Sequence, residues 1–147
     1  MTTPTPMPPD EQHHLVGEAT KTLLGQAPSG WDRIIMDYMV LGKKVNVGAI
    51  ARMRDGSTQR FPAPRELAPM LSALRRGMYT PDGGAWYSFR LIVQPPDRFT
   101  IQYNWNDQPP FPAPPAREQF VLDQERFPRT PQNTPEWFQR GLDGSDD

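Results

Sequence analysis

AWYSFRLIVQPPDRFTIQYNW, residues 85–105, is the stretch of sequence that decides the fold. Apolar and polar residues alternate strictly on both sides of Pro95-Pro96-Asp97. This period of two is typical of β-strands, because successive side chains point to opposite faces of a sheet. Proline and aspartate favour a turn between the two runs. The stretch therefore predicts an antiparallel strand pair with one apolar and one polar face, and it places Trp86 on the polar face.

The segments outside this pair predict a second strand pair and four helices. Apolar patterning predicts strands over Trp31–Leu41 and Val45–Arg54, and helices from Asp10, over Pro64–Arg76, over Arg117–Arg126 and from Thr134. The order helix, strand pair, helix, strand pair, two helices differs from the βαβ alternation of a parallel sheet. We therefore predict an α+β domain, with a four-stranded, mainly antiparallel sheet, helices packed on one face and short C-terminal helices.

The core and the domain limits follow from the same patterns. Seven side chains are predicted to be fully buried: Leu67, Leu71, Leu74, Phe89, Leu91, Phe99 and Ile101. Residues 1–9 are proline-rich and are predicted to form a flexible tail. Residues 10–141 are predicted to form a single domain, and the acidic residues 142–147 a disordered tail.

Composition excludes several classes of function. The chain has 147 residues, 16 Lys and Arg against 17 Asp and Glu, and no cysteine. A balanced charge argues against a nucleic-acid binder held by net charge, and the lack of cysteine excludes disulfides, thiolate metal sites and cysteine catalysis. No apolar run approaches the ~18 residues of a membrane-spanning helix, and the N-terminus lacks the features of a signal peptide. We therefore expect a cytoplasmic protein without a membrane partner.

The charges are segregated along the chain. Residues 33–76 carry nine basic and three acidic residues, whereas residues 101–147 carry four basic and eight acidic ones. A charged face commonly serves solubility, but it also steers a domain towards a partner of opposite sign. Both interpretations remain open.

Candidates for catalysis or metal binding are few. His13 and His14 are too few for a structural metal site, which needs about four ligands. Asp123 and Glu125 lie two residues apart on a predicted helix, so their carboxylates point in different directions. We therefore expect no enzyme activity, no cofactor and no metal.

Three aromatic residues lie among polar neighbours. Trp86 falls on the polar face of its strand, Trp105 ends the return strand, and Phe111 lies in the proline-rich loop 108–116. Such residues are either covered by a helix or loop, or they anchor a binding interface. The alternation does not decide between the two.

Residues 77–138 contain an ordered set of short motifs. These are Met78-Tyr79, Ala85-Trp86-Tyr87, Tyr103-Asn104-Trp105-Asn106-Asp107, Glu125-Arg126-Phe127-Pro128-Arg129 and Pro135-Glu136-Trp137. In this order they resemble the YezG-type antitoxin family, the immunity proteins of bacterial polymorphic toxin systems. The chain departs from the family pattern in its proline-rich N-terminus and in loop 108–116.

The resemblance implies a small cytoplasmic α+β protein that binds a cognate toxin domain and occludes its active site. It implies a one-to-one complex, with an NAD-glycohydrolase as the expected toxin and a nuclease as the alternative. A non-catalytic adaptor or chaperone-like binding module is the alternative from another class of function.

The expected toxin-binding surface lies at one end of the strand pair 85–105. A tight turn at 95–98 would place residue 86 opposite residue 107, and loop 108–116 leaves from the same edge. Aromatic side chains beside amides and carboxylates have the composition of an interface core and its rim. The residues expected to bind the toxin are Tyr79, Trp86, Trp105, Asn106, Asp107, Phe111, Asp123 and Glu125.

Overall fold

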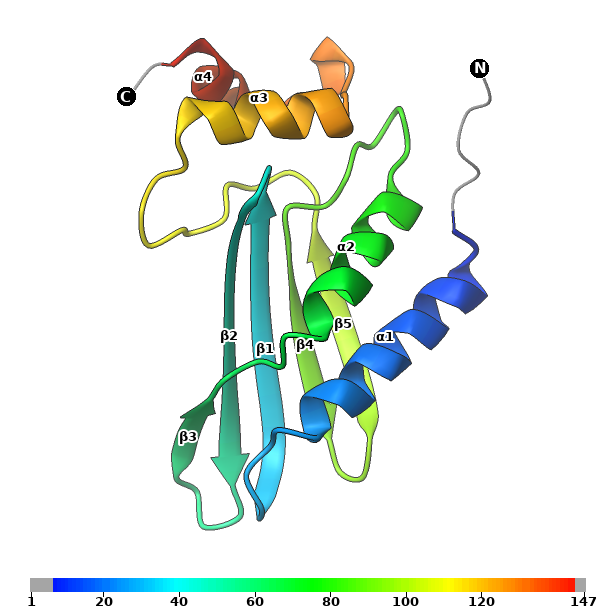
Figure 1. Cartoon of the computed structure of the whole chain (residues 1–147), viewed down its shortest axis with the longest axis vertical. Helices are drawn as coiled ribbons and strands as arrows, with labels where there is room; N and C mark the ends of the chain where they lie inside the picture. Colours follow the sequence, from blue (N-terminus) through cyan, green and yellow to red (C-terminus); the bar gives the residue numbers. More distant parts are fainter. Residues whose placement is uncertain (1–6, 145–147) are drawn as a thin grey trace.

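The computed structural model describes residues 7–144, which form one sheet, a helical layer on one of its faces and a helical cap at one end (Figure 1). The elements, in chain order, are α1 (Pro9–Leu24), β1 (Trp31–Leu41), β2 (Lys44–Met53), β3 (Thr58–Phe61), α2 (Leu67–Met78), β4 (Ser88–Gln94), β5 (Arg98–Asn104), α3 (Arg117–Arg126), the 3₁₀ turn η1 (Pro131–Asn133) and α4 (Glu136–Asp143). The α+β class is confirmed.

The sheet has five strands in the order β3-β2-β1-β4-β5, and every neighbouring pair is antiparallel. The prediction of four strands is therefore wrong by one. Strand β3 has no recognisable sequence pattern, because its four residues, TQRF, are too few to show a period and three of the four are exposed. Such short edge strands are common in natural sheets.

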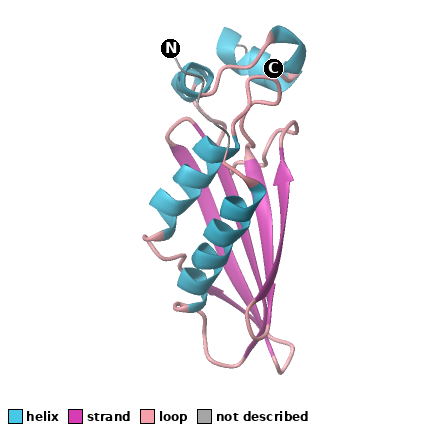
Figure 2. Ribbon diagram, turned by 90° about the vertical axis from the view of Figure 1, so that its right-hand side faces the viewer, coloured by secondary structure: helices cyan, strands magenta, loops and turns pink. Residues whose placement is uncertain are grey.

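Helices α1 and α2 lie side by side on one face of the sheet, and no helix of residues 7–144 covers the other face (Figure 2). The covered face supplies Ile34 and Met36 from β1 and Leu91 and Val93 from β4, all of them buried. Ile35, between the first two, lies on the open face. The consecutive apolar residues 34–36 are therefore divided between the two faces, which their sequence alone left ambiguous.

A second, smaller apolar cluster lies where α3 and α4 cap the end of the sheet. It consists of Leu41, Tyr87, Phe120 and Phe138, which are all buried. The ring centroids of Phe120 and Phe138 lie 5.4 Å apart in an edge-to-face arrangement. Helix α3 has the predicted bounds, and α4 begins directly after Pro135.

Two of the seven predicted core residues are only half-buried. Phe99 and Ile101 lie on β5, which is an edge strand, so each lacks a neighbouring strand on one side. The other five predicted core residues are buried. The alternation identified the correct face of the sheet but not the position of the strand within it.

Trp86 does not lie on the polar face, so that prediction is wrong. The regular strand begins at Ser88, and the chain before it does not follow the strand alternation. Trp86 is fully buried in the main core, with its ring 5.3 Å from that of Phe89. The register is also one residue off the prediction, because Ser88 pairs with Asn104.

The two predicted tails partly belong to the domain. Met7 donates its N–H to the carbonyl of Gly77, and α1 begins at Pro9, so residues 7–9 are part of the fold. At the other end, α4 continues to Asp143, and the carbonyl of Leu142 accepts a hydrogen bond from Arg117. The remaining tail residues, 1–6 and 145–147, lie outside the described residues.

Candidate functional site

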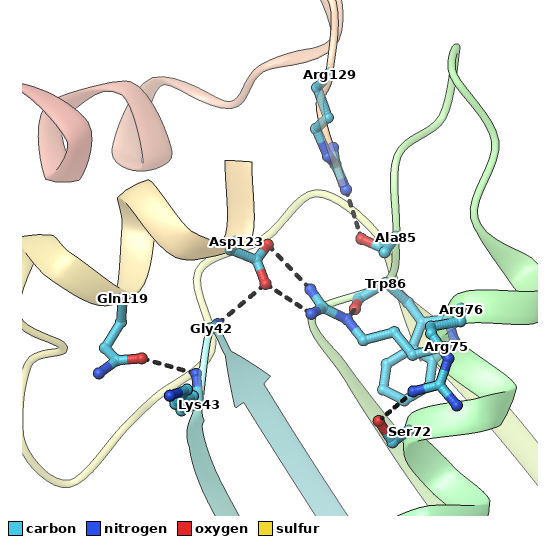
Figure 3. Close-up of polar contacts among 10 residues, drawn as sticks. All are labelled: Gly42, Lys43, Ser72, Arg75, Arg76, Ala85, Trp86, Gln119, Asp123 and Arg129. Carbon is cyan, nitrogen blue, oxygen red and sulfur yellow. Dashed lines mark hydrogen bonds and ion pairs between the residues drawn. The ribbon is translucent and has the colours of Figure 1, made fainter. Parts of the chain in front are cut away.

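A buried ion pair joins the helical cap to the rest of the domain (Figure 3). Two guanidinium nitrogens of Arg75, on α2, lie 2.6 and 3.1 Å from the two carboxylate oxygens of Asp123, on α3. Both side chains are about 95% buried. The third nitrogen of Arg75 donates to the carbonyl of Trp86 at 2.8 Å, and the guanidinium lies 4.6 Å from the ring centroid of Phe127. The geometry is bidentate, which favours the pair energetically and fixes its orientation.

Helix α3 also holds the β1–β2 hairpin. Asp123 accepts a hydrogen bond from the N–H of Gly42 at 3.0 Å, and Gln119 accepts one from the N–H of Lys43 at 2.7 Å (Figure 3). Gly42 has a positive φ of 59°, and a Cβ there would collide with the backbone of Gln119. Glycine is therefore required at this turn on both counts.

Arg129 anchors the segment that follows α3. Its guanidinium donates to the carbonyls of Ala85, Trp105 and Asn133 at 2.8, 2.8 and 3.0 Å, and it lies 4.5 Å from the ring centroid of Tyr87. Burial lowers the pKa of this guanidinium, but the charge is satisfied by three carbonyl oxygens and an aromatic face. Arg129 thus ties the ends of β4 and β5 to the C-terminal segment.

The segment 104–107, which we call the rim loop, is fixed by side chains from three directions. The Asn104 side chain donates to the carbonyl of Asp107 at 2.8 Å and accepts from the N–H groups of Asp107 and Asn106 at 2.9 and 3.3 Å. Trp137 donates its indole N–H to the carbonyl of Asn106 at 2.7 Å, and Arg129 binds the carbonyl of Trp105. The side chains of Asn106 and Asp107 are exposed. The rim loop therefore presents two polar side chains on a backbone that is held in place.

Tyr79 and Phe111 lie apart from the rim loop in the sequence and have their own contacts. Tyr79 is half-buried, donates its hydroxyl to the carbonyl of Pro128 and packs on Phe127 at a centroid distance of 5.6 Å. Burial raises the pKa of this hydroxyl. Phe111 is half-buried against the smaller apolar cluster, with the Lys44 ammonium 5.9 Å from its ring centroid.

The structure separates the predicted site residues into surface and interior. Trp86 and Asp123 are buried and committed to internal contacts, so neither offers a surface to a partner, and their assignment as toxin-binding residues is corrected. A tryptophan and a carboxylate among polar neighbours are commonly exposed, but this fold buries both. Trp105, Asn106 and Asp107 do lie together, while Glu125 is exposed on α3.

Three residues that organise the site were not predicted: Arg75, Arg129 and Trp137. The sequence does contain a signal for the first of them. Arg75 lies four and eight residues after Leu71 and Leu67, on the apolar stripe of α2, and a cation on a buried stripe requires a buried partner. Arg129 and Trp137 belong to the motif set of residues 77–138, but the sequence does not indicate their contacts, because these join segments that are far apart along the chain.

The described residues offer no centre for a metal ion. Within residues 7–144, no group of three or more histidines and carboxylates converges. On α1, the exposed His14 side chain lies 3.9 Å from the Glu18 carboxylate, and the ring centroids of His13 and Phe99 are 5.0 Å apart. In the same part of the chain, no helix combines the length and the apolar character that crossing a membrane requires.

The arrangement of the site is suited to binding through a rigid, polar loop. Comparison of the sequence with protein-family models and with curated proteins gave no match in either case.

Proposed function

We propose that this chain is an immunity protein, which binds a cognate toxin domain in the cytoplasm and occludes its active site without catalysis. The observation that carries the proposal is the rim loop, which displays Asn106 and Asp107 on a backbone fixed by Asn104, Arg129 and Trp137. A loop that is already ordered loses little conformational entropy on binding, and this raises affinity. Immunity proteins need tight and rapid capture, and a rigid surface serves the first need.

The charge of the surface supports a toxin with a cationic cleft. Of the three carboxylates among the expected toxin-binding residues, Asp123 is buried, whereas Asp107 and Glu125 are exposed and available to a partner. A cleft built for the phosphates of NAD or of nucleic acid is lined by cations, so exposed carboxylates complement it and speed association. We propose an NAD-glycohydrolase as the toxin and a one-to-one complex, with a nuclease as the alternative.

Co-expression tests the proposal directly. Where a toxin gene neighbours the gene for this chain, cells that express its toxin domain should grow when the chain is present and fail to grow when it is absent. Intracellular NAD should be preserved if the toxin is a glycohydrolase, and nucleic acid should be preserved if it is a nuclease. Loss of growth despite a well-expressed, folded chain would contradict the proposal.

A further inference from the structure

An open groove lies between α2 and the hairpin end of β1 and β2, on the helix-covered side of the sheet. Its volume is about 800 Å³. Its apolar lining includes Tyr38, Val40 and Val45 from the sheet, Leu71 from α2, and Phe127. Helices α1 and α2 lie over β1, β4 and β5 and leave this part of β2 uncovered (Figure 1). As a result Val45 and Val47 are 46% and 44% exposed, although they lie on the face that elsewhere forms the core.

The edge of β2 beside this groove has no neighbouring strand among the described residues. Strand β3 pairs only with Ala49–Arg52, so Lys44–Gly48 forms the border of the sheet. The chain continues from Phe61 through Pro62 and Pro64, which lack the N–H that a longer β3 would need. An unpaired strand edge is a template for another extended segment.

The hydrogen-bonding groups of the β2 backbone point towards the free edge of the sheet at Val45 and Val47. Alternate residues of a strand direct their N–H and C=O to opposite sides. Met53 donates its N–H towards β3, to the carbonyl of Ser57 at 2.7 Å. Val45 and Val47 have the same phase along the strand as Met53, so their N–H and C=O groups face the free edge.

The groove is cationic at its rim. Lys43, Arg76 and Arg126 line it, and none of its lining residues is acidic. The charge of Arg75, which also lines the groove, is compensated by Asp123. The side chains of Lys43, Arg76 and Arg126 are exposed. Charge complementarity therefore favours an occupant that carries carboxylates as well as apolar side chains.

We propose that an extended segment of a partner protein binds here as an added strand on the edge Lys44–Gly48. Main-chain hydrogen bonds to Val45 and Val47 would supply affinity, and alternate side chains in the groove would supply specificity. The partner segment has apolar side chains where it lies beside Val47 and Val45. It has acidic side chains where it approaches Arg76 and Arg126. This surface shares no residue with the rim loop, so it does not depend on the proposed toxin.

Two acetylated, amidated heptapeptides serve as probes, VTVTETE and its reverse ETETVTV, because the added strand can run in either direction. Isothermal titration calorimetry should show that at least one of them binds, whereas the lysine counterparts VTVTKTK and KTKTVTV bind at least tenfold more weakly. Hydrogen exchange of the Val45 and Val47 amides, followed by NMR, should slow on binding.

Charge reversal in the groove supplies the matched controls. Arg76→Glu and Arg126→Glu should each weaken the acidic peptide at least tenfold, whereas Arg65→Glu, an exposed cation outside the groove, should leave its affinity unchanged. Equal binding of acidic and lysine peptides, unchanged affinity in both groove variants, or binding without protection of Val45 and Val47 would overturn the proposal. Protection of these amides in a self-associated protein without peptide would also overturn it, because a second copy would then be the occupant.

Discussion

The buried pair of Arg75 and Asp123 shows how single residues set the position of the helical cap. Removing two charges from water is costly, and their attraction compensates only where the geometry is good and the remaining polar atoms are satisfied. Both conditions hold, since Arg75 also donates to Trp86 and Asp123 also accepts from Gly42. The pair therefore contributes to the specificity of docking more than to net stability.

Breaking this pair should be far more damaging than removing a surface charge. Asp123→Ala leaves the Arg75 guanidinium buried without its carboxylate, and we expect a loss of about 3–5 kcal/mol in the free energy of unfolding. Glu125→Ala, an exposed carboxylate on the same helix, is the matched control and should change stability by less than about 0.5 kcal/mol. Denaturant unfolding measures both, and similar values for the two variants would contradict the assigned role of Asp123.

At the residue scale the helical spacing predicted the buried positions of α2 correctly, whereas the burial of Trp86 and Asp123 was not predicted. Leu67, Leu71 and Leu74 are buried as the helical spacing indicates. The burial of Asp123 has no local signal in the sequence, because its partner Arg75 lies 48 residues away. The prediction for Trp86 is wrong because the strand alternation does not hold in the two residues before β4 begins at Ser88.

Among the elements, the rim loop depends most on one side chain, that of Asn104. Asn104→Ala removes its hydrogen bonds to the backbone of Asn106 and Asp107, and we expect a loss of about 1–2 kcal/mol. Gln102→Ala, exposed on the same face of β5, should cost less than about 0.5 kcal/mol. Thermal unfolding compares the two, and amide exchange should become faster at residues 106–107 only in the Asn104 variant. An unaltered exchange rate there would show that the other contacts suffice to hold the loop.

Strands β4 and β5 differ in how much core they bury, and a cross-strand pair tests this difference. Leu91 and Ile101 lie opposite each other, but Leu91 is 1% exposed whereas Ile101 is half-buried. Leu91→Ala should cost about 2–5 kcal/mol, and Ile101→Ala clearly less, because the cost grows with the cavity left behind. Equal losses in chemical denaturation would mean that β5 is as deeply buried as β4.

On the scale of the whole molecule, patterns within one element were predictable and contacts between distant elements were not. The antiparallel pair 85–105 and helix α3 were predictable from local periodicity and from the prolines that end these elements. The site is different, because the rim loop is formed where the end of β5 meets Arg129 and Trp137 from the C-terminal segment. Only folding brings those residues together, so the sequence indicated the loop's exposed residues but not what fixes them.

The core as a whole should make the protein sensitive to alkali. Burial raises the pKa of Tyr103 to about 12 and also raises the pKa values of Tyr38 and Tyr87. In the unfolded chain tyrosine ionises near pH 10, so between about pH 10 and 12 the unfolded state loses its protons first and stability falls. Below pH 10 this effect is absent. Melting temperatures measured from pH 8 to 11.5 should drop above pH 10, and the drop should be smaller in Tyr103→Phe; an identical drop would contradict the assignment.

The most direct test of the central claim is the affinity of the rim loop for a toxin domain whose toxicity the chain relieves in the co-expression experiment. The double variant Asn106→Ala/Asp107→Lys alters two exposed side chains and leaves the backbone contacts of Asn104, Arg129 and Trp137 in place. Calorimetric titration of the toxin domain should show affinity reduced by about 100-fold or more, with an unchanged melting temperature. Full affinity in that folded double variant would contradict the claim that the rim loop binds the toxin.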